Sequence, residues 1–165
     1  MSRIDPEQPI LASVLDRLLD DDPDALTDPT LSRGMHLVRL REALRRDIEA
    51  LLNAHQYCRP VPRDLTELPA SLLDYGLPHY LGMTAASESA REAFRSEVES
   101  ILRRFEPRFK KVAVRLLENA ETAERTLRFR IDALVHADPA PEPVSYNSRL
   151  DPTQQRFTVT SAARD

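Results

Sequence analysis

Residues 94–118 read FRSEVESILRRFEPRFKKVAVRLLE, and this stretch decides the fold class. In its first half the apolar side chains recur every three or four residues, as on one face of a helix: Phe94, Val98, Ile101, Leu102 and Phe105. Pro107 ends this helix, because the residue before a proline avoids helical backbone. Beyond it Val112, Val114 and Leu116 alternate with other residues, which is typical of a strand with one buried face.

A second and more regular alternation follows at residues 127–135, where every other residue is apolar: Leu127, Phe129, Ile131, Ala133 and Val135. Together with residues 108–118 it predicts an antiparallel hairpin with one face buried. We interpret the next segment, which contains Pro139, Pro141 and Pro143, as a proline-rich link. A last short strand is predicted from Arg156 to Thr160, with Phe157 and Val159 facing inward.

Helices are predicted before these strands. Residues 36–54 carry apolar side chains at the helical period, and Pro60, Pro62 and Pro69 prevent the helix from continuing. A short helical turn within 68–78 is closed by Gly76, and a further helix begins after either Thr84 or Ser87 as its N-cap. Helices followed by strands predict an α+β fold, with N-terminal helices packed on a small C-terminal antiparallel sheet. No internal repeat is evident.

Residues 1–35 are polar and rich in proline, and we expect a partly flexible arm before a single α+β domain at 36–165. Within the arm an amphipathic helix is predicted that docks on another surface: Ile10, Leu11, Val14, Leu15, Leu18 and Leu19. The aspartates at 20–24 do not form an EF-hand loop, since Ala25 and Leu31 stand where that loop needs glycine and glutamate. No metal site is therefore predicted.

Composition narrows the function classes. The 165 residues include 23 Lys and Arg against 27 Asp and Glu, so the net charge of -4 argues against a dedicated nucleic-acid binder. The lone cysteine, Cys58, excludes an intramolecular disulfide. No apolar run is long enough to span a membrane, so we expect a cytoplasmic protein without direct membrane insertion.

The sequence specifies no catalytic residue and no cofactor. Its four histidines are scattered, and its three glycines form no phosphate-binding loop. The most unusual local feature is Glu106-Pro107-Arg108 at the helix-to-strand junction. Extended backbone around Pro107 would place Glu106 and Arg108 on one side as a solvent-facing docking pair. The alternative is a local ion pair at the end of a helix. A neighbouring guanidinium favours the carboxylate form, which makes Glu106 a poor glycosidase acid.

Four segments in order resemble the TssE family, the small baseplate wedge subunits of bacterial type VI secretion systems. The same family includes the wedge protein of contractile-phage baseplates and has been labelled lysozyme-like. The segments are LDRLLDDDP at 15–23, SLLDYGLP at 71–78, Glu106-Pro107-Arg108, and FRIDAL at 129–134 followed by Pro143 and the last strand.

The resemblance implies a structural baseplate component without catalysis. It implies that Glu106, Pro107 and Arg108 bind the core bundle of the larger wedge subunits, of the TssF, TssG and TssK type. It also implies that the sheet templates the contractile sheath, of TssB and TssC type subunits, by strand addition. We expect the last strand to supply that edge, and the baseplate to be docked to the inner-membrane complex.

Two alternatives remain open at this point. One is a peptidoglycan-cleaving muramidase, which needs a second carboxylate near Glu106; Glu97 and Glu99 are the nearest candidates. The other is a small interaction module unrelated to secretion. The muramidase reading predicts an acidic cleft, whereas the baseplate reading predicts a docking pair beside an open sheet edge.

Overall fold

The computed structural model describes residues 10, 12–19, 24, 31–56, 71–78, 87–117, 126–137, 140–151 and 153–162. Three α-helices, one short 3-10 helix and four strands succeed one another along these residues. They are α1 Val14–Leu18, α2 Arg33–Asn53, η2 Leu72–Asp74, α3 Glu88–Phe105, β1 Phe109–Leu117, β2 Leu127–Val135, β3 Glu142–Asp151 and β4 Arg156–Ser161. The expected α+β class is confirmed.

The two long helices begin at serine N-caps. Ser87, and not Thr84, caps α3, since its Oγ accepts from the Ala90 amide at 3.2 Å. Ser32 caps α2, so this helix starts three residues earlier than its apolar period indicated. Several residues named from the sequence lie outside the described ranges: Leu11, residues 20–23, Ala25, Cys58, Pro60, Pro62, Pro69, Thr84 and Pro139.

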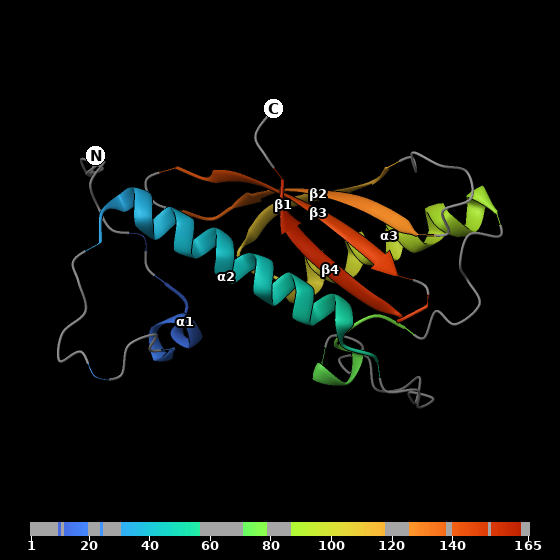
Figure 1. The fold of residues 1–165 in the computed structure, drawn as a ribbon, viewed down its shortest axis with the longest axis horizontal. Coiled ribbons are helices and arrows are strands. Elements are labelled where there is room, and N and C mark those ends of the chain that lie inside the picture. The colour runs from blue at the N-terminus through green and yellow to red at the C-terminus, as the bar shows by residue number, and fades with distance from the viewer. Residues whose placement is uncertain are drawn as a thin grey trace.

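The four strands form one antiparallel sheet in the order β1-β2-β3-β4 (Figure 1). Helix α2 packs along β4 and helix α3 along β1. Both helices contribute to one hydrophobic core with the inward side chains of all four strands. The aromatic rings of Phe94, Phe129 and Phe157 lie within 6.4 Å of one another at its centre. The opposite face of the sheet carries no helix among the described residues.

Strand β3 corrects the interpretation of residues 139–143 as a link. It runs from Glu142 to Asp151, and its residues 142–150 pair with Leu127–Val135 of β2. Its inward positions include Ser148, which interrupts the apolar alternation that would have indicated a strand. The sequence prediction missed this central strand for that reason, and because Pro143 stands near its start.

Pro143 is compatible with a central strand because of where its backbone nitrogen points. The Ala162 amide donates to the Ser145 carbonyl, so odd-numbered residues of β3 direct their backbone groups toward β4. Pro143 shares this orientation, but the pairing of β3 with β4 begins only at Tyr146. Within the described residues, its missing N–H therefore costs the ladder no hydrogen bond.

Gly76 joins the short 3-10 helix to the end of α2. Its φ is 99°, and a Cβ at this position would lie 2.3 Å from the Ala54 carbonyl oxygen. This close approach allows Leu77 N to donate to the Ala54 oxygen at 2.8 Å and Gln56 N to donate to the Leu77 oxygen at 3.0 Å. A side chain at position 76 would therefore break the contact between these two segments.

Candidate functional site

The Glu106-Pro107-Arg108 motif sits in a tight turn between α3 and β1. The Phe109 amide donates to the Glu106 carbonyl at 3.1 Å, so the backbone folds back here and is not extended as we expected. Arg108 donates from Nε to Glu106 Oε1 at 2.6 Å and from Nη2 to Oε2 at 2.5 Å. The two side chains meet as a bidentate pair through the turn.

The prediction that this pair faces solvent is wrong. Glu106 is only 6% exposed, and Arg108 is half-buried, whereas Pro107 is exposed. The turn directs Glu106 toward the body of the protein, where the Arg108 backbone amide also donates to its carboxylate. The geometry is thus the alternative from the sequence, a local ion pair at a helix end.

The pair belongs to a network that the sequence did not reveal. Arg108 Nη2 donates to Asp47 Oδ2 on α2 at 2.7 Å, and Asp47 Oδ1 accepts from Arg46 Nε at 3.0 Å. Arg46 Nη2 in turn donates to Asp16 Oδ1 on α1 at 2.8 Å. Arg108 Nη1 lies 4.0 Å from the other Asp16 oxygen. One arginine therefore connects α1, α2 and the start of the sheet.

Charge keeps this network ionised. Burial works to lower the pKa of Arg108, but the hydrogen bonds and charges of Glu106 and Asp47 outweigh it, and the pKa lies above its ordinary value. Burial works to raise the pKa of Asp16, but Ser13 and Arg46 hydrogen-bond its carboxylate and hold the pKa below its ordinary value. Arg108 and Asp16 are therefore both charged near neutral pH.

Helix α1 attaches to the domain by this charge network. Asp16 points into the network, while four apolar side chains of the segment point to solvent: Val14, Leu15, Leu18 and Leu19, each at least 51% exposed. Ile10, upstream of the helix, is buried. The expected amphipathic helix exists, but its apolar residues do not dock on the described part of this chain.

The Tyr75-Gly76 segment packs beside the same junction. The Tyr75 ring meets the Phe105 ring edge-on, with centroids 5.3 Å apart. Burial, followed by the charges of Asp47 and Glu106, raises the Tyr75 pKa. Of the other three segments noted in the sequence, two thus lie beside the Glu106-Pro107-Arg108 turn: 71–78 through Tyr75 and 15–23 through Asp16.

The free edge of β4 is held by α2. Asn53 mimics a neighbouring strand, because its Oδ1 accepts from Phe157 N at 2.9 Å while its Nδ2 donates to Phe157 O at 3.0 Å. Arg45 Nη1 donates to Val159 O at 3.2 Å, and Arg45 is itself paired with Glu42 and Glu49 at 2.7 Å each. The backbone groups that an added strand would use are thus engaged at these residues.

Helix α3 holds the opposite edge with a similar device. Arg95 Nη1 donates to Val114 O at 3.0 Å, and Val114 N donates to Glu99 Oε2 at 3.1 Å. Arg95 also pairs with Glu92 and Glu99, at 2.7 and 2.8 Å. Glu42, Arg45 and Glu49 thus recur fifty positions later as Glu92, Arg95 and Glu99, a repeat that the sequence analysis did not detect.

Two of the three carboxylates considered for a muramidase, Glu106 and Glu99, are engaged in other contacts. Both oxygens of Glu106 accept from Arg108, and Glu99 accepts from Val114 N and Arg95. Burial works to raise the Glu99 pKa, but these partners hold it below its ordinary value. No group of residues able to hold a metal ion, and no helix suited to span a membrane, occurs in the part of the chain that the structure describes.

These features define a small α+β protein in which the Arg108 network and the side chains of α2 and α3 at the sheet edges connect elements that lie far apart in the sequence. The family model described as baseplate wedge protein gp25 matches residues 38–140, a range that runs from α2 past β2 and includes the Glu106-Pro107-Arg108 turn. The chain therefore belongs to the baseplate wedge protein gp25 family, and the resemblance noted from its sequence is confirmed. Membership supports a structural role in association with other baseplate components. No curated protein matches the chain.

Proposed function

We propose that the protein is a type VI secretion baseplate subunit that joins the larger wedge subunits and templates the contractile sheath, without catalysis. The observation that carries the proposal is the Arg108-centred network within the residues matched by the family model. The network fixes the position of α1 and of the turn at Pro107 on one side of the domain. The proposed site works in the cytoplasm, where the baseplate docks to the inner-membrane complex.

The buried pair changes how the motif would bind the core bundle. Glu106 and Arg108 set the shape of the turn, and Pro107, which is exposed, offers the contact. Arg108 keeps about a quarter of its side chain exposed, so a polar group of the partner can still reach its rim. The larger wedge subunits of TssF, TssG and TssK type are the partners that we propose for this surface.

The experiment measures binding of the purified chain to a purified complex of the larger wedge subunits, by titration calorimetry. Arg108→Lys keeps the positive charge but loses the bidentate fork, so we expect binding at least tenfold weaker with a folded domain. Arg108→Ala and Glu106→Ala should bind less still. Arg39→Ala, an exposed cation of α2, is the matched control and should bind as the wild type does.

Circular dichroism on each variant separates lost binding from lost folding. Wild-type affinity in folded Arg108→Lys and Arg108→Ala variants would remove the docking role from this motif. Failure of the wild-type chain to bind folded partners would remove the partner assignment itself. In that case a peptidoglycan cleavage assay becomes the next measurement, for which the engaged carboxylates lead us to expect no activity.

Templating of the sheath by strand addition requires accessible backbone groups on an edge strand. Asn53 and Arg45 contact those groups on β4, and Arg95 and Glu99 contact them on β1; we call these two sets of contacts the edge clamps. The clamps therefore affect which edge can accept a strand of the sheath. Proline removes a backbone N–H donor, and on the outer side of an edge strand it leaves the internal ladder intact. Val159→Pro on β4 and Leu116→Pro on β1 form a matched pair, since both N–H groups face away from the sheet. Nucleation of sheath subunits of TssB and TssC type should fail in Val159→Pro and persist in Leu116→Pro; the reverse result would assign the template to β1.

A further inference from the structure

The outward face of the sheet is rich in cations although the chain carries a net charge of -4. Side chains on this face alternate with those of the core along each strand. Its charged members are six cations and two acids: Lys111, Arg115, Arg128, Arg130, Arg149 and Arg156, with Asp132 and Asp151. The rest of the chain is correspondingly more acidic, so this face is a local reversal of sign.

Four of the arginines stand in directly opposed pairs. The register places Arg115 opposite Arg130 across β1 and β2, and Arg128 opposite Arg149 across β2 and β3. Like charges directly opposite one another on neighbouring strands destabilise a sheet. The register therefore brings two pairs of like charges together on the central part of one face, and other partners of these arginines can offset the repulsion only in part.

The two acidic residues of this face offset part of this repulsion. Asp132 accepts from Arg130 Nε at 3.2 Å and lies 3.9 Å from Arg115 Nε. It also accepts from Ser145 Oγ at 2.7 Å. The pair of Arg128 and Arg149 lies on the other side of the Arg115–Arg130 row, where Asp151, two residues from Arg149 on β3, borders the same depression.

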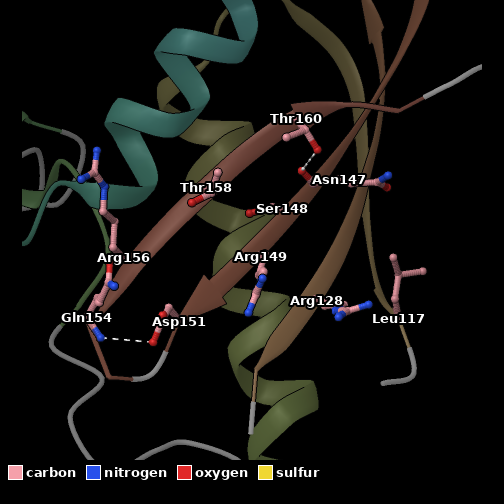
Figure 2. A pocket seen from close by; sticks show the side chains of 10 residues that line it. All are labelled: Leu117, Arg128, Asn147, Ser148, Arg149, Asp151, Gln154, Arg156, Thr158 and Thr160. Atoms are coloured by element: carbon pink, nitrogen blue, oxygen red, sulfur yellow. Dashed lines mark hydrogen bonds between the residues drawn. The ribbon is translucent and has the colours of Figure 1, made fainter. Parts of the chain in front are cut away.

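A shallow depression of about 470 Å³ marks the surface around Arg128 and Arg149 (Figure 2). Figure 2 shows the Arg149 side chain between those of Arg128 and Arg156. Asn147, Thr158 and Thr160 border the depression and add neutral hydrogen-bonding groups. Such groups suit the backbone and the polar side chains of a peptide, while the arginine forks suit carboxylates.

We propose that this face binds an extended, acidic segment of another baseplate protein. In an extended segment, alternate side chains point the same way at a spacing of about 6.6 Å, so a Glu-x-Glu pattern can present successive carboxylates to the two arginine pairs. The charge reversal on this face selects an acidic partner. The surface does not include Glu106, Pro107 or Arg108, so it is a second interface beyond the proposed wedge-joining site.

A protein segment fits this surface better than nucleic acid does. Phosphate backbones are bound by cationic surfaces that follow them over many charges, and the rest of this chain is acidic. Asp132 and Asp151 also interrupt the cationic face. Nucleic acid is nevertheless the natural competitor for an arginine-rich surface, and it enters the test as such.

The test uses the full chain and a fluorescent nine-residue peptide of alternating Glu and Thr, with binding followed by anisotropy. Arg128→Gln combined with Arg149→Gln should weaken binding at least tenfold. Arg39→Gln combined with Arg91→Gln removes the same charge from the exposed faces of α2 and α3 and should change binding less than twofold. A Gln-Thr peptide of equal length should not bind.

Three results would overturn the proposal. Equal losses in the two double variants would show a diffuse charge effect. Tighter binding of a duplex DNA than of the acidic peptide would assign the face to nucleic acid. A lower melting temperature in the Arg128 and Arg149 variant would show that these arginines act through the fold, whereas relief of repulsion predicts an unchanged or higher one.

A further binding measurement distinguishes this interface from the wedge-joining site. The Arg128 and Arg149 double variant is titrated against the larger wedge subunits, with Arg108→Lys alongside. Full wedge affinity in the sheet variant, with loss of the acidic peptide, is the expected result. Loss of wedge affinity in both would merge the two interfaces into one and overturn the second interface.

Discussion

The two edges of the sheet are held by helices in similar ways but by different chemistry. At β1, the Val114 N–H is accepted by Glu99, a carboxylate that also pairs with Arg95. At β4, the Phe157 N–H is accepted by Asn53, a neutral amide that also donates to the Phe157 carbonyl. The acceptor of the strand N–H is therefore an ionisable carboxylate at β1 and a neutral amide at β4, although arginine–glutamate pairs accompany both.

The difference has a positional origin. Asn53 stands one turn beyond Glu49 on α2, and the equivalent position on α3 is Arg103, which pairs with Glu99 instead of with the strand. On α3 the Glu99 carboxylate itself accepts the hydrogen bond from the strand N–H. Both edges thus share an arginine that pairs with two glutamates on the helix. They differ in the residue that accepts the hydrogen bond from the strand N–H.

Removal of the Asn53 side-chain amide should change the free energy of unfolding most. Asn53→Leu leaves both backbone groups of the fully buried Phe157 without their partner, and we expect the free energy of unfolding to fall by about 3 kcal/mol. Urea denaturation measures the change. Arg103→Leu is the control at the equivalent position; its exposed ion pair should contribute less than about 0.5 kcal/mol. Similar losses at both positions would end the distinction between the clamps.

Neutralising the carboxylate of the other clamp should cost less. Glu99→Gln retains an acceptor for the Val114 N–H but loses the charge that pairs with Arg95 and Arg103. Because Glu99 is partly exposed, we expect a loss of about 1 kcal/mol in the same denaturation experiment. Glu49→Gln is the matched control on α2, where no carboxylate contacts the strand N–H. A larger loss in the control than in Glu99→Gln would contradict the assigned roles.

The smallest effect is a pH dependence confined to one edge. The Glu99 pKa lies below its ordinary value of 4.5, so the stability that this carboxylate contributes is present above that value and is lost as the pH falls through the folded-state pKa. Amide exchange, corrected for its intrinsic pH dependence, should show protection at Val114 falling in acid before that at Phe157. Parallel loss at both amides would show that global unfolding sets the protection.

The sequence predicted well what depends on local periodicity. The helices at 36–54 and after Ser87, and the strands at 108–118, 127–135 and 156–160, were found because one buried face repeats at a fixed spacing. Strand β3 was missed because Pro143 and the inward Ser148 conceal that spacing. The apolar residues of α1 were expected to dock, but the helix is attached by Asp16.

The candidate site was predictable only where its residues are neighbours in the chain. Glu106 and Arg108 were paired correctly from their separation of two residues, but the turn at Pro107 reversed the direction in which they point. Asp47 lies 61 residues from Arg108, and no local pattern on α2 marks it as a partner. The edge clamps were missed for the same reason, since each joins a helix to a strand far along the chain.

The contact of Gly76 with the end of α2 also bears on how this protein can be altered. Because Leu77 N donates to the Ala54 oxygen and Gln56 N donates to the Leu77 oxygen, the two ends of the connection between these segments are held together. The entropy of closing such a connection grows slowly with length, by about 0.6 kcal/mol for each doubling. We therefore expect that lengthening the connection between residues 56 and 71 by a short peptide tag costs the contact at Gly76 little stability, which makes this connection a place to attach a label for following the subunit during assembly.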